Sequence, residues 1–121
     1  MSVSSDVRGA QESFSHDDPP EGKQLSTAAS VFNMLADPTR LHLLWILCQG
    51  EADVTTLAMN TEASRTSISQ HLAKLRLAGL VATRRESRHV VYSMPDGHLR
   101  RLVSEALNYA DHQVTGEPPH S

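Results

Sequence analysis

Residues 64–80 constrain the fold of this chain most, because apolar side chains recur in them at helical spacing. Ile68, Leu72 and Leu75 lie on one side of a helix with 3.6 residues per turn. Ser64 is a favourable N-cap residue, and Gly79 is a typical helix stop. The segment therefore predicts an amphipathic helix that buries one stripe.

The side of this helix opposite the stripe carries short hydrogen-bonding and basic side chains. Thr66 and Gln70 lie within about 20° of the direction opposite Ile68, at 100° per residue. Gln can pair bidentately with adenine, whereas Ser and Thr can contact bases or phosphates. The residues expected on this DNA-reading face are Thr66, Ser67, Ser69, Gln70 and Lys74, and Arg65 and Lys74 can contact the DNA backbone. An ordinary solvated surface remains the alternative for the helix considered alone.

The segments on either side of this helix favour the DNA-reading interpretation. A short helix is expected over residues 54–60, with Asp53 as its cap, and residues 61–63 make a tight connection. After the reading helix, residues 81–85 and 89–93 follow the period-2 pattern of a β-hairpin. This order predicts a winged helix-turn-helix.

Arginines surround the tip of the predicted hairpin: Arg84, Arg85 and Arg88. In a wing they would contact phosphate or the minor groove. The alternative is a charged strand edge that prevents aggregation. The helix before the hairpin favours the wing.

The charge distribution also favours DNA. The net charge is −3, and residues 1–24 carry all of it, with five acids against Arg8 and Lys23. Residues 64–101 carry a local charge of +6, from eight arginines and lysines against two acids. A basic segment beside a predicted reading helix is the electrostatic pattern expected of a DNA-binding surface.

Two further helices are expected before the helix-turn-helix. The first has an apolar stripe running from Leu25 through Phe32 to Leu35 or Ala36, and Asp37-Pro38 ends it. The second runs from about residue 39 to 48, and its predicted core stripe is Leu41, Leu44, Trp45 and Cys48. Cys48 is thus expected to be a core residue rather than a reactive thiol or metal ligand. A single cysteine excludes an internal disulfide and fits a reducing cytoplasm.

A last helix is expected over residues 98–113. Its apolar stripe consists of Leu99, Leu102, Val103, Ala106 and Ala110. Because this helix lies outside the helix-turn-helix, we expect it to pair with the first helix and with its own copy in a homodimer. A two-fold dimer would read a palindromic operator with its two reading helices.

The expected architecture is a mainly α fold with a small β-hairpin (α+β), a winged helix-turn-helix. Residues 1–23 are predicted to be a disordered acidic tail, 24–113 the DNA-binding and dimerisation domain, and 114–121 a flexible C-terminal tail. No apolar run approaches the roughly 18 residues needed to cross a bilayer, and the polar, acidic N-terminus does not resemble a signal peptide. We therefore expect a cytoplasmic protein with no membrane partner and no small-molecule substrate.

Two histidines on the last helix are candidate metal ligands. His98 and His112 are separated by about 21 Å at 1.5 Å per residue, so one helix cannot bring both to one ion. They fall within about 40° of the same face, and antiparallel packing of two such helices would bring His98 of one subunit near His112 of the other. Asp96, Asp111 and His120 could add ligands. The alternative is that these histidines are surface residues.

Enzymatic function is not expected. The histidines are scattered along the chain, and neither a His-Glu-x-x-His nor a Gly-x-Ser-x-Gly motif occurs. A metallohydrolase would need three close ligands and an open coordination position. The DNA-binding interpretation therefore remains.

Three segments resemble the ArsR/SmtB family of metal-sensing repressors. They are Leu35-Ala-Asp-Pro-Thr-Arg-Leu41, residues 66–81 and the hairpin strand that ends Val90-Val-Tyr92. The resemblance covers about residues 25–113. It implies a dimeric winged-helix protein that binds operator DNA when metal-free and releases it when metal binds, so that efflux or detoxification genes are transcribed.

The ligand pattern resembles the actinobacterial nickel and cobalt sensors of that family. Residues 51–57 lack the cysteine motif of the arsenic, lead and cadmium sensors, and Tyr109 stands where the zinc sensors have a histidine. The resemblance instead implies ligation by His98, Asp111, His112 and His120. Ser121 occupies the position of a second tail histidine, so one ligand is missing or is supplied by Asp96, the N-terminal tail or water. Ni(II) or Co(II) is the expected regulatory ligand and Zn(II) is possible. The alternative is a DNA-binding regulator whose metal site has degenerated and which responds to redox or a partner protein.

Overall fold

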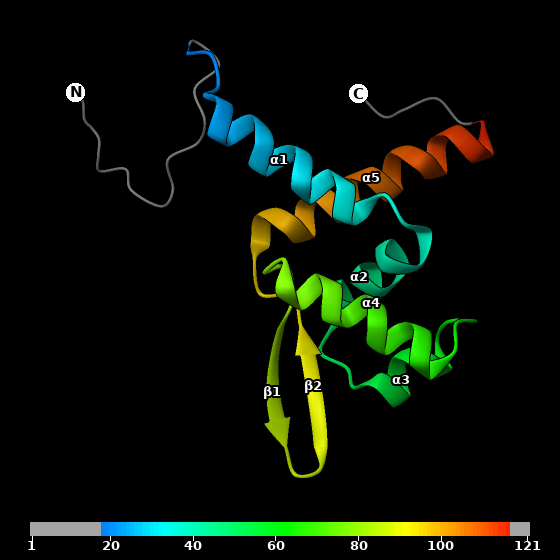
Figure 1. Cartoon of the computed structure of the whole chain (residues 1–121). Helices are drawn as coiled ribbons and strands as arrows, with labels where there is room; N and C mark the ends of the chain where they lie inside the picture. The colour runs from blue at the N-terminus through cyan, green and yellow to red at the C-terminus, as the bar shows by residue number, and fades with distance from the viewer. Residues whose placement is uncertain (1–17, 117–121) are drawn as a thin grey trace. The chain divides into compact units, whose positions relative to one another are not determined.

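The computed structural model describes residues 18–116, and the chain divides into two parts, residues 1–30 and 31–121, each described here by itself. Helix α1 crosses the boundary, and every other element belongs to the second part (Figure 1). The elements are α1 (Gly22–Leu35), α2 (Pro38–Gln49), α3 (Val54–Met59), α4 (Arg65–Leu77), β1 (Ala82–Glu86), β2 (His89–Ser93) and α5 (Gly97–Thr115). The prediction of a mainly α fold with one β-hairpin is confirmed.

The core of the second part lies between α2, α3, α4 and the first half of α5. Ile68, Leu72 and Leu75, the predicted stripe of α4, are completely buried. Helix α4 ends at Leu77, and the predicted stop residue Gly79 has a φ of +80°, which allows the amide of Leu80 to donate to the carbonyl of Leu75 at 2.9 Å. Helix α4 is therefore held on its inner side by packing and at its end by a glycine cap.

Four helices of the second part begin with a side-chain cap. Asp37 accepts from the amide of Thr39 at 2.8 Å at the start of α2, and Asp53 accepts from the amide of Thr56 at 2.8 Å at the start of α3. Ser64 caps α4 by accepting from the amide of Ser67 at 3.1 Å, and Asp96 caps α5. The caps expected at Asp37, Asp53 and Ser64 are confirmed.

The predicted core stripe of α2 is correct only in part. Leu44 is buried as predicted, and Leu41 and Cys48 are partly buried against the core. Trp45, however, is 42% exposed, and Leu43 and Leu47 are buried instead. Nearly every position of this helix from residue 41 to 48 is apolar, so periodicity cannot identify one inward side. The neighbours of α2 decide it, because α4, α5 and β2 all contact this helix.

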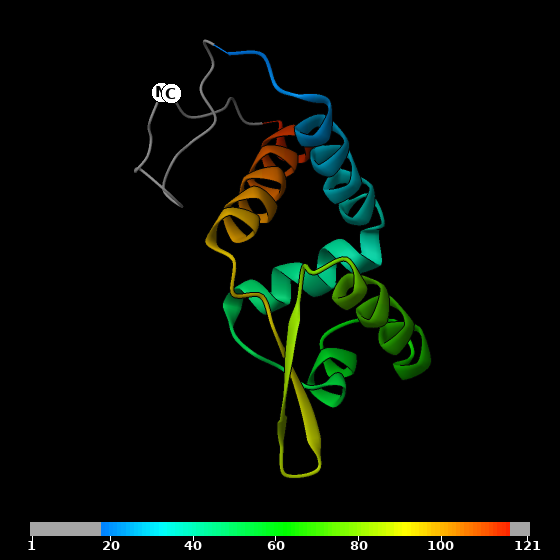
Figure 2. The ribbon, with the colours of Figure 1, turned by 60° about the vertical axis from the view of Figure 1, so that its left-hand side comes forward.

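The two strands form an antiparallel hairpin with a two-residue turn, Ser87 and Arg88. Thr83 pairs with Tyr92, and Glu86 pairs with His89 at the turn. Figures 1 and 2 show the hairpin projecting from the helices of the second part, as a wing does. The predicted wing is therefore present.

Helix α5 extends two residues beyond its predicted end, to Thr115, and Gly116 stops it with a φ of +77°. Its first half packs within its own chain, since Leu99 and Val103 are buried. The expectation that the whole stripe lies outside the compact unit was therefore wrong for this half. In the second half Tyr109 and Val114 are exposed. Among residues 18–116, no helix has both the length and the apolar character that a membrane span requires.

Candidate DNA-binding surface and metal-ligand residues

Helix α4 presents the predicted reading face outward. Thr66, Ser69 and Gln70 are exposed, and Ser67 is half-buried. Arg65 and Lys74 are also exposed, one near each end of the helix. The buried stripe on the other side prevents the helix from rotating, so these side chains stay available to a ligand outside the protein.

The three wing arginines differ in their surroundings. Arg84, Arg85 and Arg88 are all exposed, Arg84 by 49% of its side chain. Arg84 is paired: its Nη2 donates to Oε1 of Glu51 at 2.7 Å, and its Nη1 lies 3.4 Å from Oε2 of Glu86. The hydrogen bond and charge of Arg84 lower the pKa of Glu51, and Glu51 raises the pKa of Arg84. The structure therefore brings Arg84 to carboxylates on its own chain.

The contact between Glu51 and Arg84 was not predicted from the sequence. Glu51 lies 33 positions before Arg84, in the loop between α2 and α3. No periodicity or spacing rule connects two positions so far apart. Only the folded hairpin brings them together.

The start of α5 holds two of the predicted metal ligands. Asp96 accepts from the amide of Leu99 at 3.0 Å, and this backbone hydrogen bond lowers the pKa of its carboxyl. Nη2 of Arg101 lies 2.9 Å from Nδ1 of His98. Asp96 and His98 line a hollow of about 250 Å³ together with Leu80 and other apolar residues.

The other end of α5 holds Asp111 and His112. Two adjacent helical residues could reach one ion only if the helix end frayed, but α5 continues to Thr115, beyond both of them. Their side chains leave the axis about 100° apart. Asp111 is exposed and His112 is half-buried. His120 lies outside the described residues.

Metal ligation requires donors within about 2–3 Å of one ion. Across residues 18–116 there is no group of three or more His, Cys, Asp or Glu side chains arranged to hold one. His98 and His112 lie near opposite ends of a single helix. Within residues 18–116 of one protomer, the predicted ligands Asp96, His98, Asp111 and His112 therefore do not come together at one point.

Cys48 is half-buried against the core, as predicted. Its Sγ lies 3.9 Å from the carbonyl oxygen of Arg100. Burial raises the pKa of the thiol, although a hydrogen bond with Ser104 opposes this shift. A raised pKa keeps the sulfur protonated near neutral pH, and the thiol form is a weak nucleophile and a weak metal ligand.

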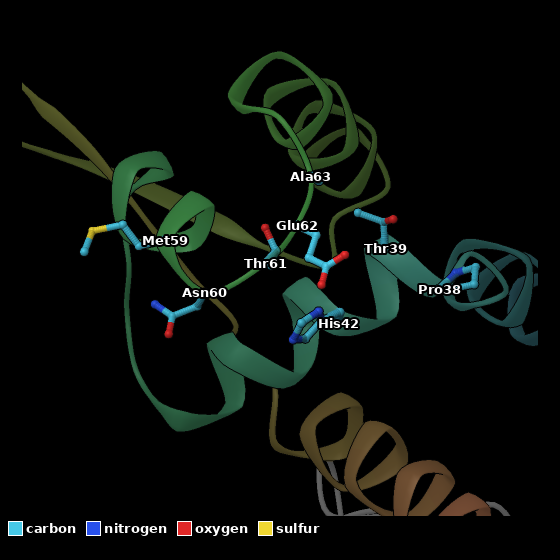
Figure 3. A pocket seen from close by; sticks show the side chains of 8 residues that line it. All are labelled: Pro38, Thr39, His42, Met59, Asn60, Thr61, Glu62 and Ala63. Atoms are coloured by element: carbon cyan, nitrogen blue, oxygen red, sulfur yellow. The ribbon is translucent and has the colours of Figure 1, made fainter.

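A large open hollow of about 800 Å³ lies between the first turns of α2 and the segment that connects α3 to α4. Figure 3 shows Thr39 and His42 on α2 facing Thr61 and Glu62 of that segment, with Met59 at the far end. None of the predicted DNA-contacting or metal-ligating residues lines it. The predicted DNA-contacting and metal-ligating residues are therefore separate from this hollow.

Comparison with known proteins identifies the family. The sequence profile of the bacterial regulatory protein arsR family matches residues 37–83, which contain the helix-turn-helix. The HTH-type transcriptional regulator KmtR of Mycobacterium tuberculosis is 43% identical over 103 residues, which cover 85% of this chain and 79% of that protein. This chain belongs to the ArsR family. The resemblance seen in the sequence is thus confirmed, and residues 37–83 are the part of the family fold that the profile describes.

Solved structures of ArsR-type proteins share the fold. The solution structure of apo-NmtR has a TM-score of 0.65 and 33% identity, and the match covers 88% of this chain and 87% of that one. The homodimeric winged helix-turn-helix domain Mb0332 of Mycobacterium bovis, a possible ArsR-family regulator, has a TM-score of 0.69 and 32% identity, with 80% of this chain and 90% of that chain covered. The chain is therefore a winged helix-turn-helix protein of the transcriptional-regulator class.

Proposed function

We propose that this ArsR-family chain is a metal-responsive transcriptional repressor. As a homodimer it binds palindromic operator DNA when metal-free, and Ni(II) or Co(II), with Zn(II) possible, releases it, so that metal-efflux genes are transcribed. It acts in the cytoplasm, where the DNA lies. The outward reading face of α4 beside an arginine-bearing wing is the observation that carries the proposal.

The DNA contacts divide into base reading and backbone contacts. Gln70, with Thr66, Ser67 and Ser69 beside it, reads base edges in the major groove. Arg65 and Lys74 contact phosphates beside the reading helix, and the wing contributes arginines next to the minor groove. The burial of Ile68, Leu72 and Leu75 supports this division, because it orients the opposite face of α4 outward.

The homodimer uses α1 and the second half of α5. Phe32 is 57% exposed and Tyr109 is 67% exposed in the single chain, and Val114 is also exposed. Association that covers these side chains removes apolar surface from water. The winged helix-turn-helix domain of the Mycobacterium bovis relative is homodimeric, which supports a homodimer for this chain.

The metal ligands come from both subunits. Antiparallel packing of two α5 helices places Asp96 and His98 of one subunit near His112 of the other, with Asp111 and His120 as further donors. Nickel and cobalt accept six nitrogen and oxygen ligands, which suits this mixed set. Within one chain His98 already accepts from Arg101, so the imidazole is available only after that guanidinium moves.

Regulation follows from a difference in ligand geometry between two arrangements of the dimer. A ligand shifts an equilibrium only by its differential affinity for the two states. His98 and His112 therefore regulate DNA binding only if they approach each other closely in the arrangement that does not fit DNA. A coupling of about 1–3 kcal/mol is typical of such systems.

The test is DNA affinity measured with and without each divalent metal. Purified full-length protein first selects its operator from a random duplex library, and fluorescence anisotropy then gives Kd with Ni(II), Co(II), Zn(II) or EDTA. We expect Ni(II) or Co(II) to weaken operator binding about 5- to 150-fold, the factor that corresponds to the coupling above. Mg(II) is the matched control. Tight binding that no metal weakens would contradict metal regulation and leave a DNA-binding regulator with another effector.

A further inference from the structure

The base of the wing is joined to the loop between α2 and α3. The amide of Ala52 donates to the carbonyl of Tyr92 at 3.1 Å, and the amide of Tyr92 donates to the carbonyl of Ala52 at 2.8 Å. This isolated antiparallel bridge places the loop beside β2. The wing is thus attached to the helix-turn-helix through the residue just before the cap of α3.

Side-chain pairs lie on both sides of this bridge. Glu51 precedes Ala52 and pairs with Arg84 at 2.7 Å. Asp53 follows Ala52, and its Oδ2 lies 3.3 Å from Nδ1 of His89. Each strand of the hairpin is therefore connected to the loop by one side-chain pair.

These contacts occupy one face of the hairpin. Arg84 lies opposite Val91 and Glu86 opposite His89, so all four residues share a face. This face borders a hollow of about 240 Å³ that Glu51 and Asp53 also line. Arg85 belongs to the other face, opposite Val90.

The charge around Arg84 disfavours a phosphate ligand. Glu51, Asp53 and Glu86 supply three carboxylates, whereas Arg84 is the one permanent cation lining that hollow, and His89 is the other titratable group there. With His89 neutral the cluster carries a net charge of −2. A DNA phosphate at Arg84 would have to replace a 2.7 Å carboxylate contact and approach the remaining acids.

We propose that Glu51 and Arg84 form a positioning pair that holds the wing against the loop between α2 and α3, and that the DNA phosphate contacts of the wing come from Arg85 and Arg88 instead. The proposal rests on the DNA-binding function proposed above. It removes Arg84 from the predicted DNA contacts and gives Glu51, an acid next to a DNA-binding surface, a role in binding.

The first test is the salt dependence of DNA binding. Full-length protein and its Arg84→Gln, Arg85→Gln and Arg88→Gln variants are titrated against a fluorescein-labelled random-sequence DNA duplex at several NaCl concentrations. The slope of log K against log[NaCl] is negative, and each lost phosphate contact reduces its magnitude by about 0.9. We expect this loss for Arg85→Gln and Arg88→Gln. For Arg84→Gln we expect an unchanged slope and a weakening of less than about tenfold that is the same at every salt concentration. A slope reduced by about 0.9 in Arg84→Gln overturns the proposal.

Glu51→Gln distinguishes the two roles of Arg84 more sharply. If Arg84 bound phosphate, removal of the Glu51 charge would free its guanidinium and tighten DNA binding. A positioning pair predicts the opposite: Glu51→Gln weakens binding by the same factor as Arg84→Gln, and the double variant is no weaker than either single variant. Tighter binding by Glu51→Gln overturns the proposal.

Amide hydrogen exchange tests the pair without DNA. We expect Glu51→Gln and Arg84→Gln to exchange faster than wild type at residues 82–93, whereas Arg85→Gln, the matched control on the other face, does not. The charge-exchanged double variant, Glu51→Lys with Arg84→Glu, should restore protection that each of its single substitutions loses. Equal exchange in all variants overturns the proposal. If the wild type binds no duplex at all, the proposed function fails, while this experiment still decides whether the pair positions the wing.

Discussion

Nε2 of His71 on α4 lies 4.0 Å from Oδ2 of Asp37, the residue that caps α2. The other ring nitrogen, Nδ1, is buried without a hydrogen-bond partner among the described residues. Nη1 of Arg40 lies 3.8 Å from the same carboxylate, and Nε of Arg40 donates to the carbonyl of Met34 near the end of α1 at 2.8 Å. The segment from Asp37 to Arg40 thus joins the end of α1, the start of α2 and the reading helix. Its role is structural.

Asp37→Ala should therefore lower the free energy of unfolding by about 1–2 kcal/mol, because it removes the cap of α2 along with the contacts to Arg40 and His71. Urea denaturation followed by circular dichroism measures the change. Asp37→Asn is the matched control, since asparagine still caps the helix but carries no charge. We expect it to be intermediate, and an Asp37→Ala protein as stable as the wild type would contradict this account.

Acid should destabilise the fold through its capping carboxylates. Although burial raises it, the pKa of Asp37 is lowered on balance by hydrogen bonds from Thr39 and Arg40 and by nearby positive charge, and the amide of Thr56 lowers the pKa of Asp53. A carboxyl whose pKa is lower in the folded state stabilises the fold above its unfolded pKa, about 3.8, and this stabilisation is lost as the pH falls through the folded value. The free energy of unfolding should thus decrease from about pH 5 to pH 3. In Asp53→Asn the decrease should be smaller, because asparagine caps α3 without titrating. An identical pH dependence in both proteins would exclude Asp53 as a contributor.

Substitutions of base-reading residues and of residues that contact the DNA backbone should have different effects on DNA binding. Gln70→Ala should weaken binding to the selected operator by about 1–3 kcal/mol and relax its sequence preference, because it removes a base contact. Arg88→Ala should weaken binding to all duplexes and reduce the salt dependence. Competition between operator and random DNA measures both effects. If Gln70→Ala keeps the full operator preference, Gln70 is not a base reader.

The dimer prediction uses positions that are exposed in the single chain. Ala106→Glu with Tyr109→Glu places charge in the proposed α5 interface and should produce monomers by analytical ultracentrifugation. Leu102 is unsuitable for this test because it packs against the core of its own chain. Asn108→Glu, on the opposite side of α5, is the control and should remain dimeric. A dimeric double variant would remove the second half of α5 from the interface.

Mixed dimers test whether the metal ligands come from two subunits. His98→Ala and His112→Ala should each abolish the metal response while preserving metal-free DNA binding, and His120→Ala should have a smaller effect. A heterodimer of His98→Ala with His112→Ala chains retains one complete site, so calorimetry should give half the wild-type nickel stoichiometry. His42→Ala, an exposed histidine on α2, is the control. Full stoichiometry in the His98→Ala homodimer would place the metal elsewhere.

The sequence by itself determined the elements that depend on local chemistry. The stripe of Ile68, Leu72 and Leu75, the cap at Ser64 and the stop at Gly79 lie within a few turns of one another, so periodicity and capping rules predict them. The hairpin follows from a period-2 pattern around a two-residue turn for the same reason. The start of α2 could also be predicted from the Asp-Pro-Thr-Arg segment, because that segment combines an N-cap residue, a proline suited to the first turn and a resemblance to a known family.

Only the tertiary structure decided relationships between distant segments. The inward face of α2 depends on which of its apolar sides packs against α4, α5 and β2. Because the helix is apolar nearly all round, its sequence does not indicate which side is buried. Glu51 and Arg84 meet because the Ala52–Tyr92 bridge aligns a loop with a strand. A pattern in the sequence is fixed by the periods of helices and strands, whereas an ion pair between residues 33 positions apart depends on how those elements pack.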